Sequence, residues 1–205
     1  MKKLTTTVVM FLTAIVLVTP SAFAATATSG TLNVSALVSG TLSMTVTLRS
    51  GSSTGTILTS PVSFGTLQVF TNTSTGGQTL RSSTVGGGIG DIVAMIAANS
   101  HGLPYTITQT GTMTGLPAGA CTVVPVYATQ DNGGAAKPAS ATLGTAGTWV
   151  ATGKTLYADT VGTALSTIQA HYSITDDNTA GATAAVPINQ AAGTYNGTWV
   201  ITVTA

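Results

Sequence analysis

The chain contains no glutamate and carries little charge of either sign. Only 5% of its 205 residues are charged, with six Lys or Arg against five Asp. A protein that binds nucleic acid needs clustered basic side chains to neutralise phosphates, and the sequence has no such cluster. A polybasic patch for anionic membranes is excluded for the same reason. Because Glu, Lys and Arg are the usual fillers of exposed helix faces, their scarcity also argues against a helical protein.

The chain has a single cysteine, Cys121. A disulfide framework in an exported domain needs an even number of cysteines, so this chain cannot have one. We expect Cys121 to be a small buried apolar residue; a free thiol or an intermolecular bridge is the alternative. The stability of the fold must then come from a hydrophobic core, for which a chain with 43% hydrophobic residues is long enough.

Long hydrophobic runs are missing except near the N-terminus. Lys2 and Lys3 precede an apolar run over residues 8–18, and the small-residue box AFA follows at 22–24. This three-part pattern is typical of a secretory signal peptide and predicts cleavage after the box, so residues 1–24 would be removed. A membrane anchor is the alternative, but the run is too short to cross about 30 Å of hydrocarbon. We expect an exported protein with no membrane span after signal cleavage.

Threonine, by contrast, is abundant, with 42 copies. Together with Val and Ile it gives the composition of β-strands. Apolar and polar residues alternate along 42–48, 168–175 and 195–204, which is the period-2 pattern of strands. About ten short strands separated by turn signals predict one all-β domain, a β-sandwich. No segment has a 3.6-residue period over a helical length, and we interpret the apolar run at 92–98 as a buried strand.

Three further segments carry less regular patterns. Residues 61–70 are predicted to form a strand with a bulge at Gly65. The strand at 121–128 contains Pro125, which predicts an edge strand or a bulged strand. The sequence DNGG at 131–134 predicts a hairpin turn.

The search for a catalytic or metal site gives little. His101 lies in a predicted turn and His171 on the polar side of a predicted strand, and neither belongs to a recognisable nucleophile motif. A hydrolase with a Ser-His-Asp triad stays open as a rival. The carboxylates of Asp176 and Asp177 suit Ca²⁺, but a polar turn is the better interpretation because no further carboxylate lies nearby. The sequence predicts a protein that is not an enzyme and holds no metal or cofactor.

The aromatic residues Trp149, Trp199 and Tyr195 admit two interpretations. On an exposed surface they would form a platform for sugars. Trp199, however, shares one face of the terminal strand with Ile201 and Val203, which favours packing in the core. Tyr195 stands at the start of that strand, and we expect its hydroxyl to make a hydrogen bond at the corner.

Two short motifs resemble a known family. The sequence AGTY at 192–195, followed by an alternating strand to the last residue, looks like the end of pilin-type domains of the spore coat U and archaic chaperone–usher class. The sequence VSFGTL at 62–67 is similar to the F-G-x-L/I strand of the same class. The resemblance spans most of the mature chain. One departure is that many members carry a cysteine pair in their first half, whereas here Cys121 stands alone.

The resemblance implies an incomplete immunoglobulin-like β-sandwich that is completed by strand donation between subunits. The N-terminal strand of one subunit would fill a gap in its neighbour by β-augmentation. Residues 25–40 would be the donor segment, with Gly40 as a hinge, and residues 41–205 the sandwich domain. The donor plugs would be Leu32, Val34, Ala36 and Val38. The terminal strand would form one wall of the groove through Tyr195, Trp199, Ile201 and Val203.

Together these features predict a structural subunit of a bacterial surface filament or coat. Its partners would be neighbouring copies of itself, with a periplasmic chaperone and an outer-membrane usher during export through the periplasm to the cell surface. Two alternatives stay open. Residues 31–38 are an ordinary first strand of a self-contained sandwich, or the chain is a monomeric secreted adhesin or carbohydrate-binding module.

Overall fold

The computed structural model describes residues 25–28, 33–38, 42–59, 61–71, 76–82, 92–150, 152–163, 166–175 and 180–205, with the backbone alone for 25–28, 33–38 and 166. The predicted signal peptide at 1–24, Leu32, Gly40 and the acidic turn at 176–178 lie outside these residues.

The described chain is all-β, with three antiparallel sheets and one short 3-10 turn, η1 (Ala118–Ala120). The six-stranded sheet has the order β10 (Gly147–Thr148), β8 (Cys121–Val126), β12 (Ser166–Ile174), β6 (Ile92–Asn99), β3 (Leu42–Ser50), β2 (Asn33–Val38). The five-stranded sheet has the order β1 (Ala25–Thr28), β14 (Gly197–Thr204), β7 (Tyr105–Met113), β11 (Lys154–Asp159), β9 (Ala141–Leu143). The third sheet has the order β13 (Val186–Pro187), β5 (Gln78–Arg81), β4 (Gln68–Thr71).

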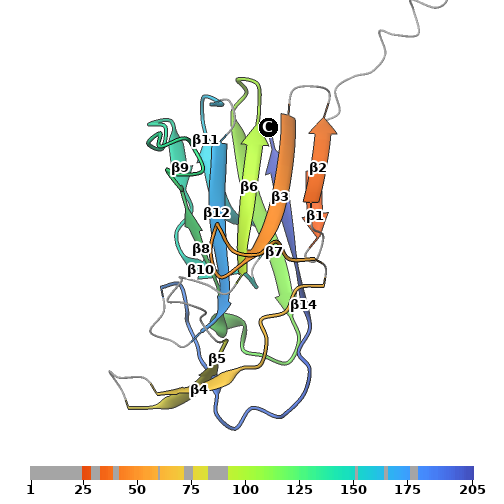
Figure 1. Ribbon diagram of the computed structural model, residues 1–205, viewed down its shortest axis with the longest axis vertical. Helices are drawn as coiled ribbons and strands as arrows, with labels where there is room; N and C mark the ends of the chain where they lie inside the picture. Colours follow the sequence, from red (N-terminus) through yellow and green to blue (C-terminus); the bar gives the residue numbers. More distant parts are fainter. Residues whose placement is uncertain are drawn as a thin grey trace, which may run out of the picture.

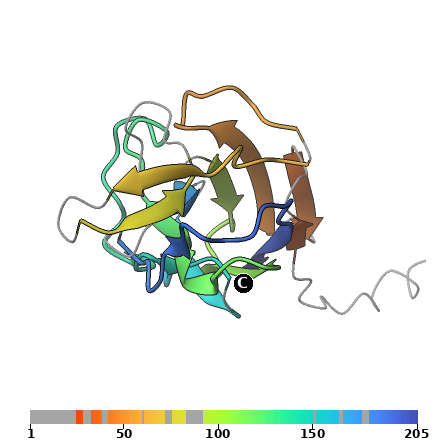
Figure 2. The same cartoon turned by 90° about the horizontal axis from the view of Figure 1, so that it is seen from below.

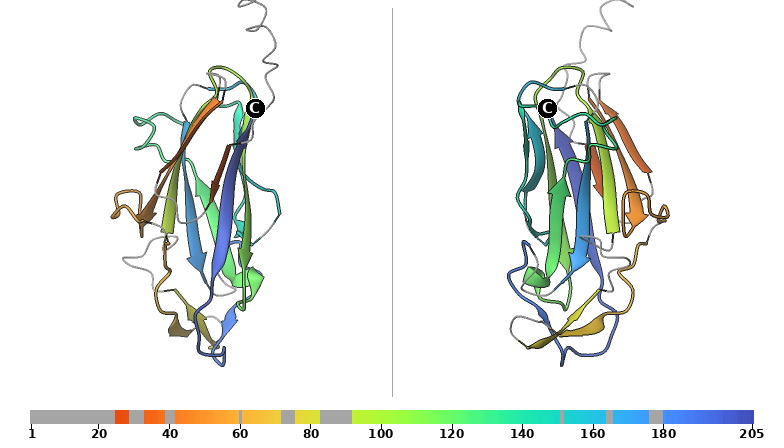
Figure 3. Two further views of the ribbon diagram at one scale, coloured as in Figure 1. Left: turned by 90° about the vertical axis from the view of Figure 1, so that its right-hand side faces the viewer. Right: turned by 60° about the vertical axis from the view of Figure 1, so that its left-hand side comes forward.

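The two large sheets lie face to face and share one hydrophobic core, an arrangement consistent with a β-sandwich (Figure 3). The alternation of apolar and polar residues along each strand explains which side chains enter this core. In β3, for example, Leu42, Met44 and Val46 are buried, whereas Thr45 between them is exposed. The apolar run at 92–98 is the buried strand β6, as predicted.

The two ends of the molecule are built from different elements. We call one the C-terminal pole, because the C-terminus lies there; β2 ends and β3 begins at the same pole (Figure 1). The third sheet lies across the opposite end, which we call the far pole (Figure 2). Since β14 runs from the far pole to the C-terminal pole, its antiparallel neighbour β1 runs the other way.

The prediction of one strand over 61–70 is wrong for most of its length. Only the last residues belong to β4, and 61–67 have no regular structure. Gly65 has a positive φ of 74°, which an L residue in a strand rarely adopts. Val62 and Phe64 nevertheless pack against the core. An irregular segment that packs on the core can therefore bury every second residue without pairing as a strand. For this reason the alternation at 61–67 does not identify a strand.

The predicted hairpin at 131–134 is also wrong, although the turn itself is present. Gly133 and Gly134 have positive φ values of 64° and 80°. The chain does not return beside β8, however; it crosses to the other large sheet and forms β9. The side-chain NH₂ of Asn132 fixes this crossing by donating to the carbonyl oxygens of Ala128 (2.7 Å) and Thr167 (2.8 Å).

Pro125 lies where the sequence predicted an edge. Among the described strands, the outer neighbour of β8 is β10, which pairs with Thr122 and Val123 and ends there. No described strand pairs with the outer side of Pro125, so its missing N–H costs no ladder hydrogen bond there.

Candidate assembly interface

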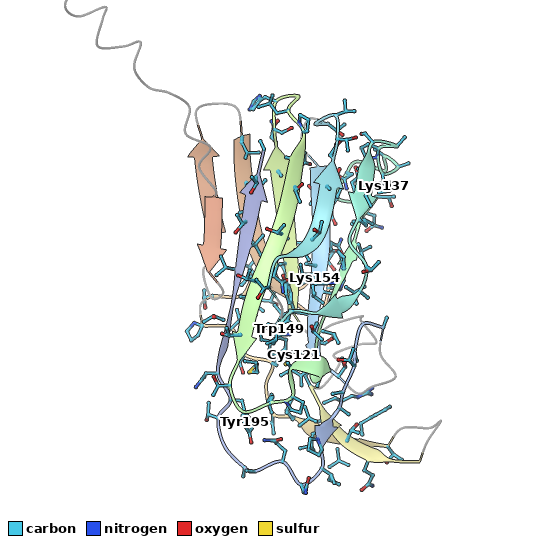
Figure 4. All side chains as sticks on the ribbon, turned by 180° about the vertical axis from the view of Figure 1, so that it is seen from behind. Cys121, Lys137, Trp149, Lys154 and Tyr195 are labelled. Atoms are coloured by element: carbon cyan, nitrogen blue, oxygen red, sulfur yellow. The ribbon has the colours of Figure 1, made fainter. Side chains whose placement is uncertain are left out.

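The N-terminal segment borders both large sheets on the same side of the molecule (Figures 1 and 4). Strand β1 pairs with β14, and β2 pairs with β3. The sequence predicted a single donor strand here, whereas the structure has two strands that separate after Thr28 and before Asn33. The dipeptide Ser29-Gly30 is a turn signal that sequence reasoning passed over.

The register places three of the four predicted donor residues opposite core positions of β3. Val34 is opposite Val46, Ala36 opposite Met44 and Val38 opposite Leu42. Residues directly opposite in an antiparallel pair lie on the same face of the sheet, and these three partners are at most 3% exposed. The donor residues therefore stand on the core face of the edge strand of their own chain.

The other side of the candidate interface is β14. Trp199, Ile201 and Val203 lie on its core face and are 3%, 1% and 0% exposed. One edge of β14 pairs with β7 over all eight of its residues. The other edge pairs with β1 only from Val200 to Val203, so β1 covers half of that edge.

An aromatic cluster lies beneath this edge. The ring of Trp199 stacks on Tyr172 with 4.8 Å between centroids, and meets Trp149 edge-on at 5.6 Å. Phe64 stacks on Trp149 at 6.2 Å and lies 6.3 Å from Trp199, so the three rings form a triangle. Both tryptophans are buried in the core, so neither forms part of an exposed platform for sugars.

One polar network crosses the core between the two large sheets. The Tyr172 hydroxyl of β12 donates to Gln109 Oε1 of β7 at 2.6 Å. Gln109 Nε2 in turn donates to the carbonyl oxygen of Trp149 at 2.9 Å. Burial raises the pKa of Tyr172 far above its usual value, so the phenol stays a neutral donor. Sequence reasoning missed Gln109, although it occupies the apolar phase of the strand that contains Tyr105 and Ile107.

Tyr195 lies apart from the other three residues assigned to the groove wall. It precedes β14, is half-buried, and packs in a smaller cluster with Leu116 near the far pole (Figure 4). Its hydroxyl donates to the carbonyl oxygen of Ala191, which is the expected corner hydrogen bond, and accepts from Gln190 Nε2 at 3.0 Å. The AGTY motif therefore forms the corner from which β14 starts.

The described residues bring together no catalytic or metal cluster. No group of three or more His, Cys, Asp or Glu within them has a spacing that holds a metal ion. His101 is exposed in a turn, with φ of 51°. His171 is buried, and its Nε2 lies 3.0 Å from Gln169 Oε1 rather than against a serine or an aspartate. Gln169 Nε2 donates to the Asp131 carboxylate.

The buried position of His171 predicts a loss of stability in mild acid. Because Gln169 offers its oxygen, His171 Nε2 carries the proton, and Nδ1 is buried without a partner. Burial lowers the pKa of His171. The unfolded chain therefore takes up this proton first, and stability falls as the pH drops below about 6.5, by up to about 1.4 kcal/mol per pH unit.

Denaturant unfolding at pH 7.5 and 5.5 measures this effect. The His171→Gln variant should show a flatter pH dependence than the wild type in this window, and a His101→Gln variant serves as the matched control. An unchanged slope in His171→Gln would contradict the assignment.

Cys121 is the small buried residue that the sequence predicted. It is 0% exposed, and burial raises the pKa of its thiol to about 12. It is free, and its Sγ lies 3.8 Å from the Pro117 carbonyl oxygen. Because the thiolate is the reactive form, Cys121 should be inert in the folded protein.

Within the part of the chain that the structure describes, no helix has the length and hydropathy needed to cross a membrane.

Comparisons of the chain with family models, curated proteins and solved structures found no match.

Proposed function

We propose that this chain is a structural subunit of a bacterial surface filament or coat, and that copies join by exchanging their N-terminal segments. The observation that carries the proposal is the position of β1 and β2. They are edge strands of the two large sheets, and among the described strands each pairs with one partner. The segment can therefore leave without breaking any pairing among β3 to β14, and an extended segment of a second copy can pair with the edge of β14 that it leaves.

Strand addition supplies both affinity and register. The backbone groups of an open edge bind an extended chain, and alternate side chains select its register. With β1 and β2 gone, the open edges would lie beside core residues such as Met44, Ile201 and Val203. Exposed edges of this kind promote aggregation. We therefore expect a neighbouring copy to cover them in the filament, and a periplasmic chaperone and an outer-membrane usher to cover them during export.

The remaining parts of the proposal come from the sequence. The signal-peptide pattern at 1–24 supports export to the cell surface. The AGTY and VSFGTL motifs support an immunoglobulin-like sandwich of the pilin type. The low charge also suits contacts between identical copies, because few like charges have to be brought together.

A monomeric adhesin or carbohydrate-binding module is the second candidate. The observation that favours it is that β1 and β2 pair within their own chain. A sandwich closed in this way needs no neighbour to complete it.

Deletion of residues 25–38 from the mature chain separates the two candidates. The first predicts a folded domain that no longer polymerises, whereas the wild type, sheared from cells, gives an unboiled ladder on a denaturing gel that collapses to one band on boiling. Val34→Asp is the matched point variant, because a charge would enter an apolar position. A wild-type monomer band in both lanes, or a deletion variant that unfolds, would contradict the first candidate.

A further inference from the structure

The acceptor edge of β14 is occupied by the chain's own N-terminus. In the β1 pairing, Ala25 lies opposite Val203 and Ala27 opposite Ile201. Alanines thus stand opposite Ile201 and Val203, and the β1 pairing stops before Trp199. The more apolar part of the N-terminal segment, β2, lies instead on β3 in the other sheet.

The direction of β2 is incompatible with a linear polymer. Its end at Val38 lies at the C-terminal pole, opposite Leu42 (Figure 1). If a neighbour's segment replaced β2 in the same direction, the body of that neighbour would also start at this pole. Every subunit would then join the next at the same pole, which closes a pair of copies instead of extending a chain.

A single strand antiparallel to β14 has the direction that a linear polymer needs. Its C-terminal end would lie opposite Gly197, where β14 begins at the far pole. The body of the donor would then follow beyond the far pole of the acceptor. Successive copies would join far pole to C-terminal pole, and such a head-to-tail contact can repeat without closing.

The size of the side chains selects one register for this strand. With Val34 opposite Ile201, Ala36 falls opposite Trp199 and Val38 opposite Gly197. The smallest donor residue then meets the largest residue of β14, and a valine meets the glycine. Adding a β-carbon to Gly197 would place it 3.1 Å from the Trp149 ring, so this end of the edge lies beside the aromatic cluster. By alternation, Leu32 takes the next core position, opposite Val203.

From these pairings we infer that β1 and β2 form an intramolecular cap, and that a second copy assembles by displacing β1 from β14. The incoming segment pairs seven residues out of register with the cap, since Val34 replaces Ala27 opposite Ile201. The edge of β14 is then occupied by β1 in the monomer and by a neighbour's segment in the polymer. Release of β1 is the step that permits assembly. This inference rests on the proposed function, because it specifies the partner and the control of the same edge.

A disulfide between Thr26→Cys and Thr202→Cys tests the cap. The two residues are directly opposite in the β1 pairing, and opposite residues of antiparallel strands have Cα atoms about 4.5–5.5 Å apart, within the range of a disulfide. The oxidised variant should stay monomeric in the ladder assay, and a reductant should restore the wild-type ladder. Cys121 is buried and inert, so it does not interfere.

The matched control is a disulfide between Thr112→Cys and Thr198→Cys. These residues are opposite in the pairing of β14 with β7, and their hydroxyls are 2.9 Å apart. This bond leaves the N-terminal segment free, so the variant should assemble whether oxidised or reduced. It also shows that oxidation alone does not stop assembly.

The register has its own readout. Asn33→Cys together with Thr202→Cys should give disulfide-linked oligomers in sheared filaments, because the new register places these residues opposite each other in different copies. Assembly of the oxidised Thr26–Thr202 variant, or filaments without the Asn33–Thr202 crosslink, would overturn the inference while leaving the proposed function intact. Failure of the wild type to form a ladder, with the Thr26–Thr202 bond formed, would overturn the proposed function and the inference with it.

Discussion

Replacing Trp149 by alanine is expected to lower the free energy of unfolding by about 3–5 kcal/mol. The indole is completely buried and packs against the rings of Phe64 and Trp199, which also lie 6.3 Å from each other. The backbone on both sides is held by two hydrogen bonds, from Trp149 N to the Cys121 carbonyl (2.8 Å) and from Gln109 Nε2 to the Trp149 carbonyl (2.9 Å). The neighbouring backbone therefore cannot easily collapse into the space, and a cavity should remain.

Trp149→Phe is the matched control for this prediction. The indole Nε1 is buried with no hydrogen-bond partner, so phenylalanine removes an unsatisfied donor while it keeps an aromatic ring. We expect a clearly smaller loss than for alanine, because phenylalanine removes less volume and leaves a smaller cavity. Urea unfolding followed by circular dichroism measures both variants. Equal losses for alanine and phenylalanine would contradict the importance of the aromatic stack.

Replacing Asp159 by alanine should cost about 2–3 kcal/mol, the upper range for hydrogen bonds to a charged group. Asp159 ends β11 and is 1% exposed. Its carboxylate accepts from the amides of Val161 (3.0 Å), Gly162 (3.2 Å) and Thr163 (2.9 Å), and from the Thr163 hydroxyl. Without the carboxylate, these donors lose their hydrogen-bond partner and must bind water instead. The turn after β11 is then no longer held by side-chain hydrogen bonds to Asp159.

The same carboxylate should make the protein sensitive to strong acid. Burial alone would raise the pKa of Asp159, but the hydrogen bonds from Thr163, Val161 and Ser140 outweigh it and hold that pKa well below its usual range. The stabilisation is therefore fully present above about pH 4 and is lost as the pH falls below that value. Unfolding between pH 5 and 2 measures it. Asp159→Asn should flatten this dependence, and an equally steep loss in the variant would assign it to other carboxylates.

The local sequence pattern predicts which residues form strands better than it predicts what those strands contact. β3, β6, β12 and β14 follow from alternation or from a compact apolar run. The polar face predicted for β12 is nevertheless buried, since Gln169, His171 and Ser173 are at most 8% exposed. Hydrogen bonds make this burial tolerable: Gln169 donates to Asp131, and Ser173 pairs with Thr122 at 3.0 Å. Such partners come from other strands and loops, and a period-2 pattern holds no information about them.

At the candidate interface, too, the sequence pattern predicts the face of a strand but not which strand it pairs with. Val34, Ala36 and Val38 were assigned to one apolar face from sequence alone, and the register places them on the core face of β2. The separate strand β1 was not expected, because ATAT at 25–28 is too short and too weakly apolar to stand out. Its pairing with β14 joins residues 25–28 to residues 200–203, which no local window of sequence can contain.

That pairing has a consequence for the order of folding. β1 is the first described strand and β14 the last, so the contact between Ala25 and Val203 spans nearly all of the described residues. Contacts of this kind form late, because a long loop must close before they bring any gain, and they slow folding. A chain synthesised from its N-terminus must therefore wait for its final residues before β1 finds its place. During this interval β1 has no strand to pair with, and under the proposed assembly self-closure competes with capture by another copy, with an outcome set by rates and by local concentration.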